Sequence, residues 1–129
     1  MKKAIIKNQQ RLKRKKRTRS KILGTKERPR LTVQRSNNHI HLQAIDDEKG
    51  HTLISASTLQ LKSKLPLTAD SPLAKKIKKS DQVLKVSDIL VQKIKEAGIS
   101  AMVFDRGCYK YHGRIKIIVE ILRKEGIKI

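Results

Sequence analysis

The chain has 129 residues, a length that fits one domain, and a formal net charge of +21. No window resembles a membrane span or a secretory signal, the single Cys108 cannot form an intrachain disulfide, and GxGxxG, GxxxxGK[ST], HExxH and CxxC motifs are absent. The positive charges of so small a protein repel one another, so we expect its partner to be a polyanion. Nucleic acid is the first candidate and an anionic membrane surface is the second.

The N-terminal segment carries most of the excess charge. Residues 1–30 hold 14 Lys and Arg residues and one acid, Glu27. Blocks of like charge stay mobile until a partner neutralises them, so we expect residues 1–27 to form a flexible arm, disordered or a fluctuating helix when free. A solubilising surface would mix both signs, a transit peptide would contain more Ser, and a membrane-surface helix would need more apolar residues than Leu12. The arm's nucleic-acid-binding candidates are Arg11, Lys13, Arg14, Lys15, Lys16, Arg17, Arg19 and Lys21.

A globular domain is expected over residues 28–129, beginning with alternating apolar and polar residues. The segments 31–35, 39–44 and 52–58 alternate and are separated by turn residues, which predicts an antiparallel meander. The acidic turn Asp46-Asp47-Glu48 is interpreted as solvated. The core candidates are Ile40, Leu42, Ala44, Ile54 and Ala56, and the polar residues expected on the opposite face are His39, His41, Gln43 and Ser55.

Two amphipathic helices are predicted in the second half of the chain. They span 81–97, with Ser80 as N-cap and Gly98 after the end, and 114–124, ended by Gly126. The apolar run 101–104 is typical of a strand buried on both faces. Between residues 60 and 79, where two prolines interrupt the pattern, a short helix from Leu73 is predicted.

The order β-β-β-α-β-α predicts an α/β (α+β) sandwich. Its sheet would be a mostly antiparallel meander with a fourth strand added by a helical crossover. If both helices cover one face, the opposite face is left for a ligand.

The loop before the last helix carries two of the chain's three aromatic residues. Flat rings, cations and the N–H groups of a helix N-terminus are suited to stacking an unpaired base and holding a phosphate. The alternative is that one Tyr belongs to the core and that the His only makes a local hydrogen bond. The binding candidates are Tyr109, Tyr111, His112, Gly113 and Arg114.

Catalytic and metal sites are weakly supported. His39, His41, Cys108 and His112 lack the paired short spacings of zinc ligands, and no third group orients a Cys–His pair. Asp105 and His112 are the one pair that an RNA-processing enzyme would have to use. We therefore predict no catalytic residue, metal, cofactor, small-molecule substrate or membrane partner, and a protein that is not an enzyme.

Three stretches together resemble a known family. They are Arg28-Pro29-Arg30-Leu31-x-Val33-x-Arg35-Ser36-Asn37-x-His39-Ile40, then Ile45-Asp46-Asp47-x-x-Gly50-x-Thr52-Leu53-x-Ser55-Ala56-Ser57-Thr58, and Val103-Phe104-Asp105-Arg106-Gly107-x-Tyr109-x-Tyr111-His112-Gly113-Arg114. Their order and spacing are similar to those of the eighteenth protein of the large ribosomal subunit, bacterial or organellar type. The match runs from the basic arm to the C-terminus.

The resemblance implies a non-enzymatic protein that binds 5S rRNA and helps attach it to the large-subunit rRNA in the central protuberance. Neighbouring large-subunit proteins that also contact 5S rRNA are implied partners, in a cytoplasmic or an organelle ribosome. The alternative is a general basic nucleic-acid-binding protein or RNA chaperone. Besides the arm and the loop, the implied RNA contacts are Arg28, Arg30, Arg35, Ser36, Asn37 and His39.

The sequence departs from the family pattern at three places. Cys108 stands where the family usually has a small residue such as Gly, Ser87 stands where it tends to have Gly, and residues 59–79 are unlike the usual connection.

Overall fold

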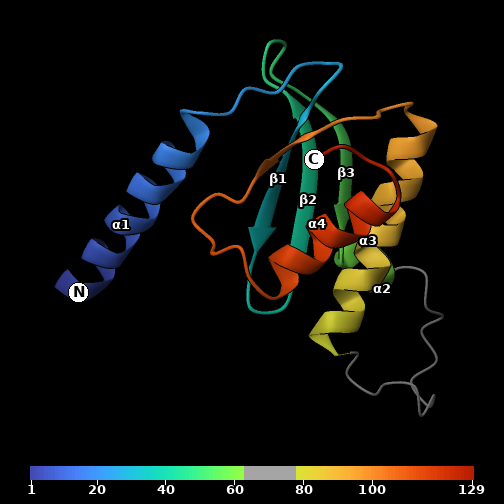
Figure 1. The fold of residues 1–129 in the computed structure, drawn as a ribbon. Coiled ribbons are helices and arrows are strands. Elements are labelled where there is room, and N and C mark those ends of the chain that lie inside the picture. Colours follow the sequence, from blue (N-terminus) through green and yellow to red (C-terminus); the bar gives the residue numbers. More distant parts are fainter. Residues whose placement is uncertain (63–77) are drawn as a thin grey trace.

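A computed structural model describes residues 1–62 and 78–129 of the chain (Figure 1). Its helices and strands follow one another in the order α1 (Lys2–Arg19), β1 (Arg30–Arg35), β2 (Ile40–Asp46), β3 (His51–Ser57), α2 (Leu59–Lys62), α3 (Lys79–Glu96), β4 (Val103–Asp105) and α4 (Arg114–Lys124). The predicted α/β class is confirmed. The short helix predicted from Leu73 lies outside the described residues.

The sheet has the order β3-β2-β1-β4. Strands β1, β2 and β3 form the predicted antiparallel meander, with Leu31 opposite Ala44 and Leu42 opposite Ala56. Strand β4 returns parallel to β1 after the α3 crossover, and Leu31 pairs with Phe104. The fourth strand therefore joins the meander at its first strand, and it is added by a helical crossover as predicted.

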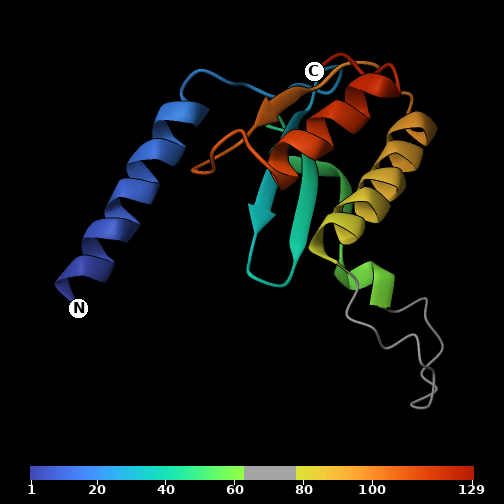
Figure 2. The ribbon, with the colours of Figure 1, turned by 60° about the horizontal axis from the view of Figure 1, so that its bottom comes forward.

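Helices α3 and α4 cover one face of the sheet (Figures 1 and 2). The alternation in each strand supplies this face with apolar residues, and the amphipathic helices bury their own stripes against them. Apolar side chains removed from water in this way are the main stabilising contribution to the fold. The core includes Leu31, Leu42, Ala44, Ile54, Ala56, Val83, Val86, Leu90, Ile94, Ile115, Ile118 and Leu122.

The arm begins with helix α1, which lies on the other side of the sheet from α3 and α4 (Figure 1). None of its side chains is buried. A helix with no buried side chain gains little from packing, and its basic residues repel one another. The mobility of the free arm stays a prediction.

The two long helices of the domain end as expected but do not both begin as expected. Gly98 has a φ of 68°, its N–H donates to the Lys95 carbonyl, and the Ile99 N–H donates to the Ile94 carbonyl. This pair of bonds is the Schellman arrangement that needs a positive φ. The predicted N-cap at Ser80 is wrong, because α3 already begins at Lys79 and Ser80 lies within its first turn.

The prediction of a fourth strand buried on both faces is also wrong. Strand β4 is an edge strand of three residues, and its Val103 and Phe104 are half-buried. An edge strand has one neighbour and is less covered than a central strand. The buried Met102 of the apolar run precedes the strand.

Candidate nucleic-acid interface

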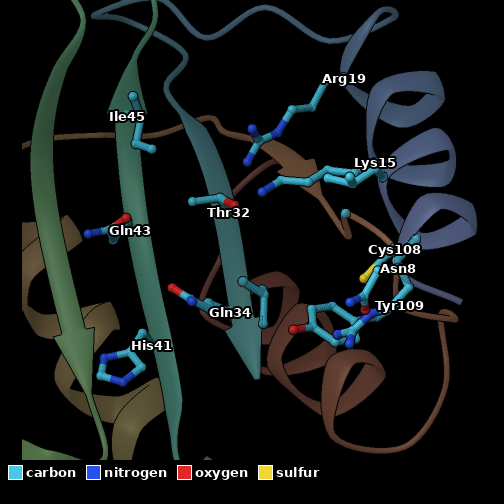
Figure 3. Close-up of a pocket in the computed structure, with 14 residues that line it drawn as sticks. Asn8, Lys15, Arg19, Thr32, Gln34, His41, Gln43, Ile45, Cys108 and Tyr109 are labelled. Atoms are coloured by element: carbon cyan, nitrogen blue, oxygen red, sulfur yellow. The ribbon is translucent and has the colours of Figure 1, made fainter. Parts of the chain in front are cut away.

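A groove of about 530 Å³ lies between α1 and the face of the sheet that α3 and α4 leave open (Figure 3). The strand alternation that turns Leu31 and Leu42 into the core turns polar residues of β1 and β2 into this groove. The face that α3 and α4 leave uncovered carries polar residues as predicted, but His39 and Ser55, which were also predicted there, are not among the residues that line the groove. Its lining consists of Asn8, Arg11, Leu12, Lys15, Arg19, Thr32, Val33, Gln34, His41, Gln43, Ile45, Gly107, Cys108 and Tyr109.

The groove combines fixed positive charge with neutral hydrogen-bonding groups. Arg11, Lys15 and Arg19 come from α1, and no carboxylate is among the lining residues that the structure describes. A side-chain hydrogen bond with Cys108 raises the pKa of Arg11, so its guanidinium is charged at neutral pH. The sheet contributes a hydroxyl, two amides and an imidazole. Such a surface favours a polyanion with sugar hydroxyls and base edges.

Two of the four polar residues that the sheet places in the groove were predicted from the sequence. His41 and Gln43 of β2 were predicted on the open face, and both line the groove. Thr32 and Gln34 of β1 were missed. The signal was present, because they alternate with the core residues Leu31 and Val33.

The C-terminal end of α1 contacts the turn after β4. The Thr18 hydroxyl lies 3.1 Å from the Gly107 carbonyl oxygen and 3.1 Å from the Arg14 carbonyl oxygen of its own helix, and its one proton is shared between these two acceptors. The Arg19 Nε donates to Asp105 Oδ2, also at 3.1 Å. The Asp105 carboxylate is fully buried, and its other oxygen accepts the Gly107 N–H at 2.8 Å. We call this pair of contacts, Thr18 to Gly107 and Arg19 to Asp105, the α1 anchor.

Arg30, predicted as an RNA contact, is held by two carboxylates. Its Nε and Nη2 donate to Asp47 at 2.8 and 2.7 Å, and its Nη1 donates to Asp105 at 2.8 Å. The side chain is only 10% exposed. The Asp47 hydrogen bond raises the pKa of Arg30, so the guanidinium keeps its proton. This bidentate geometry gives Arg30 a structural role between the β2–β3 turn and β4.

The interpretation of the acidic turn as solvated is wrong for two of its three acids. Asp46 is buried, and its Oδ1 accepts the Glu48 N–H at 3.1 Å. Asp47 binds Arg30, and this hydrogen bond lowers the pKa of Asp47 to about 2. Only Glu48 is exposed as expected. The carboxylates of Asp46 and Asp47 therefore have hydrogen-bond partners within the fold, which gives this turn a structural role.

The two tyrosines of the loop differ in their surroundings. The Tyr109 hydroxyl accepts the Arg35 N–H at 2.9 Å and donates to the Arg35 carbonyl at 3.0 Å. The Arg35 guanidinium lies 5.2 Å from the centroid of the same ring, within cation–π range. Tyr111 is 43% exposed. Tyr109 is therefore fixed within the fold, and Tyr111 is available to a partner.

Two cations lie close to each other at the start of α4. The N-cap of this helix is Gly113, which has a φ of 60° and offers no side chain to the free N–H groups of the first turn. Burial, and then the nearby charge of Arg35, lower the pKa of Arg114. This end of the helix combines free backbone donors with two guanidinium groups, an arrangement suited to an anion. His112, also predicted in this loop, is exposed.

The remaining predicted contacts are divided between the β1–β2 turn and the arm. Ser36 and Asn37 are exposed, and the Ser36 Oγ accepts the His39 N–H at 3.0 Å. His39 is half-buried, with its Nδ1 3.1 Å from the Thr58 hydroxyl. The remaining predicted cations are exposed and lie outside the groove lining; they are Arg28 and, in the arm, Lys13, Arg14, Lys16, Arg17 and Lys21.

No cluster of three or more His, Cys, Asp or Glu side chains within residues 1–62 and 78–129 is arranged to hold a metal ion. Over the same part of the chain, no helix is long and apolar enough to cross a membrane.

Comparison with known proteins places the chain in a family. A family described as ribosomal L18 of archaea, bacteria, mitochondria and chloroplasts matches residues 5–129. The chain is 44% identical over 126 residues to the large ribosomal subunit protein uL18 of Caldicellulosiruptor saccharolyticus, covering 98% of this chain and 96% of the relative. Proteins of the same name from Thermotoga petrophila and Staphylococcus haemolyticus are 47% and 46% identical, with coverage of 94% or more in each direction. The chain therefore belongs to the ribosomal L18 family and is a structural, non-enzymatic protein of the large ribosomal subunit.

Proposed function

We propose that this chain binds 5S rRNA and helps attach it to the large-subunit rRNA in the central protuberance. Neighbouring large-subunit proteins that also contact 5S rRNA are its further partners. The observation that carries this proposal is the groove, in which α1 cations face hydroxyl, amide and imidazole groups of the open sheet, with no acidic residue among the described residues of its lining. The relatives are bacterial, which indicates a cytoplasmic ribosome.

Two parts of the molecule contribute to binding in different ways. The α1 sequence contains ten basic residues and no acidic residue, so the arm neutralises phosphates and releases their counterions. This contribution does not depend on RNA sequence. The folded domain supplies neutral donors and acceptors in a fixed arrangement, which recognises the shape and the 2′-hydroxyls of a structured RNA. Specificity for one RNA therefore comes from residues 28–129 and much of the affinity from residues 1–27.

The end of the domain formed by the β1–β2 turn and the loop before α4 adds two local contacts. Arg35, Arg114 and the free N–H groups of α4 are suited to one phosphate. The exposed ring of Tyr111 is suited to stacking on an unpaired base. Tyr111 and the start of α4 follow Cys108 and Tyr109 of the groove lining directly in the chain, so one RNA can occupy the groove and this end together.

The proposal is tested with the full-length chain. Affinity for 5S rRNA is measured against salt for the wild type and for a variant in which Lys13, Arg14, Lys16, Arg17 and Lys21 are replaced by Gln. The slope of log K against log salt is expected to decrease by about 0.7 to 0.9 for each phosphate that the variant no longer neutralises. The matched control replaces five exposed lysines away from α1, namely Lys78, Lys79, Lys85, Lys124 and Lys128.

The control variant has the same net charge as the arm variant and is expected to keep most of the slope. Equal slopes for the two variants would contradict the role of the arm. In a second measurement, an RNA duplex of the same length competes with 5S rRNA for the wild type. Equal affinity for the two RNAs would replace the proposed function with general RNA binding.

A further inference from the structure

We propose that the ring of Tyr109 is a positioning group, which holds the Arg35 guanidinium beside that of Arg114 so that both cations bind one phosphate of the RNA. The inference rests on the proposed function where it concerns RNA affinity, and not where it concerns the position of Arg35. The sequence pattern placed Tyr109 among the residues suited to stacking on an unpaired base. Its contacts in the structure assign it a different role.

Tyr109 is fixed to the domain at its hydroxyl and at its backbone. The hydroxyl accepts the Arg35 N–H at 2.9 Å and donates to the Arg35 carbonyl at 3.0 Å, at the last residue of β1. The Tyr109 N–H donates to the Arg106 carbonyl at 3.1 Å, and the Arg106 Nη1 donates to the Tyr109 carbonyl at 2.9 Å. Hydrogen bonds at both ends of the residue leave the ring little freedom to turn away from β1.

The Arg35 guanidinium lies over the face of this fixed ring. Its central carbon is 5.2 Å from the ring centroid, within the range of a cation–π interaction. Arg35 is exposed, and the ion pairs within residues 1–62 and 78–129 involve other cations. A long exposed side chain without a carboxylate partner keeps much of its rotamer freedom. The ring is therefore the contact, within this described part of the chain, that limits where the guanidinium lies.

The Arg35 guanidinium held in this way lies close to a second cation. Arg114 begins α4, and burial and then the nearby charge of Arg35 lower the pKa of Arg114. Two neighbouring guanidinium groups repel each other, and an anion bound between them removes that repulsion. Each guanidinium also presents a planar fork of N–H donors that matches two oxygens of a phosphate. A fixed pair of such forks therefore favours a phosphate over the neutral parts of an RNA.

A positioning ring predicts an effect on affinity without an effect on charge. Tyr109→Leu removes the ring and the hydroxyl, whereas Tyr109→Phe removes only the hydroxyl, so a comparison of the two variants isolates the ring. The Kd for 5S rRNA is expected to be about twofold to fivefold higher for Tyr109→Leu than for Tyr109→Phe, the equivalent of one exposed cation–π interaction. Neither variant changes the number of cations, so the two salt slopes are expected to be equal.

The decisive experiment repeats this comparison in the full-length chain that carries Arg35→Gln. Without the guanidinium the ring has nothing to position, so Tyr109→Leu and Tyr109→Phe are expected to bind 5S rRNA equally in that background. A general loosening of the loop would separate the two variants in both backgrounds. The matched control compares Tyr111→Leu with Tyr111→Phe, at the exposed ring of the same loop. Their difference in Kd is expected to be the same with and without Arg35→Gln.

A second measurement follows Arg35 in the RNA-free protein. Nuclear magnetic resonance gives an order parameter for the Nε–H group of each arginine side chain. In the wild type this order parameter is expected to be higher for Arg35 than for the exposed Arg28. It is expected to fall to the Arg28 value in Tyr109→Leu and to stay higher in Tyr109→Phe. The comparison within the wild type needs no variant, so it tests the proposal even where Tyr109→Leu does not fold.

Three results would overturn the proposal. They are an equal Kd for Tyr109→Leu and Tyr109→Phe, a difference between them that persists with Arg35→Gln, and a wild-type Arg35 as mobile as Arg28. The same variants are also measured with an RNA duplex of the same length as 5S rRNA. If the ring acts through Arg35 on both RNAs and the wild type binds the two equally, the positioning role stands and the proposed function fails. The two inferences are therefore tested separately.

Discussion

Asp47 holds Gly24 through both polar groups of the glycine backbone. The Gly24 N–H donates to Asp47 Oδ2 at 2.8 Å, and the Asp47 N–H donates to the Gly24 carbonyl at 3.0 Å. The same carboxylate binds Arg30, so the connection from α1 crosses the domain at a point where three segments meet. A side chain at position 24 would lie 2.5 Å from the Arg30 nitrogen and from the Ile45 oxygen.

Gly24→Ala is therefore expected to destabilise the domain by about 1 to 3 kcal/mol, because backbone atoms of two strands would have to move. Denaturant unfolding measures the free energy. The control is Gly50→Ala, where a φ of 63° adds strain but no atom lies within 4 Å of the new methyl group. That control is expected to cost about 1 kcal/mol. A larger loss of stability for Gly50→Ala than for Gly24→Ala would contradict the close approach at Gly24.

Asp47 also makes stability depend on pH in a defined window. Its hydrogen bond with Arg30 lowers the pKa of Asp47 from 3.8 to about 2, against the opposing effect of burial, and the Gly24 N–H adds to the lowering. A carboxylate with a lower pKa in the folded state stabilises that state fully above about pH 4, and the contribution disappears as the pH falls toward about 2. Because Asp47 is partly exposed, we expect it to contribute about 1 to 2 kcal/mol.

The measurement compares the free energy of unfolding of the wild type and of Asp47→Asn between about pH 2 and pH 6. The difference between the two proteins is expected to be largest above about pH 4 and to shrink below it. Glu48→Gln, at an exposed neighbouring position, serves as the control. A wild-type advantage that is the same at both ends of this range would show that the charge of Asp47 does not stabilise the fold.

Ser87 is a buried hydroxyl within α3 that has no hydrogen-bond partner among residues 1–62 and 78–129. An unsatisfied buried polar group costs about 1 to 3 kcal/mol. Ser87→Ala removes the hydroxyl and is expected to stabilise the protein by about 1 kcal/mol, with a higher unfolding midpoint. Ser80→Ala at an exposed position of the same helix controls for helix propensity. A gain no larger at Ser87 than at Ser80 would mean that the hydroxyl is satisfied in solution.

The spacing of apolar residues predicted most of the fold, because they alternate along the strands and recur every three or four residues along the helices. The alternation around Leu31 and Leu42 defined the meander, and the same alternation placed His41 and Gln43 on the open face. The ion pairs of Arg30 were not predictable in this way. Asp105 lies 75 residues further along the chain, so only the parallel pairing of β1 with β4 brings the two side chains together.

In the candidate site too, residue types and spacing were predictable from the sequence, whereas contacts between residues far apart in the chain were not. Sequence chemistry selected the basic arm and the loop at 109–114, and the structure places α1 and Tyr109 of that loop in the groove lining. The sequence did not distinguish Tyr109 from Tyr111, because the Arg35 backbone that fixes the Tyr109 hydroxyl comes from a distant strand. Nor did it show that Arg19, which is exposed like Arg17, forms an ion pair with Asp105.

The two tyrosines are expected to respond differently to substitution. Tyr111→Ala is expected to reduce affinity for 5S rRNA by about 1 to 3 kcal/mol, the value of one stacked base, with little effect on stability. Tyr111→Phe keeps the ring and is expected to keep the affinity. Tyr109→Phe removes a hydroxyl that makes two hydrogen bonds, and its main effect is expected on the free energy of unfolding. Affinity that falls only when Tyr109 is changed would reverse this assignment.

Arg114 is expected to contribute to recognition of one RNA and not only to general attraction. Its guanidinium is partly buried at the N-terminus of α4 and close to Arg35, so we expect it to hold a phosphate at a fixed place. Arg114→Ala is expected to weaken binding to 5S rRNA more than binding to a duplex of the same length, by about 1 to 3 kcal/mol. Lys116→Ala removes a neighbouring exposed charge in the same first turn and is expected to weaken both complexes slightly and equally. Equal losses of affinity on the two RNAs for Arg114→Ala would mean that Arg114 acts only as a mobile counterion, and the specific contact would then have to lie within the groove beneath α1.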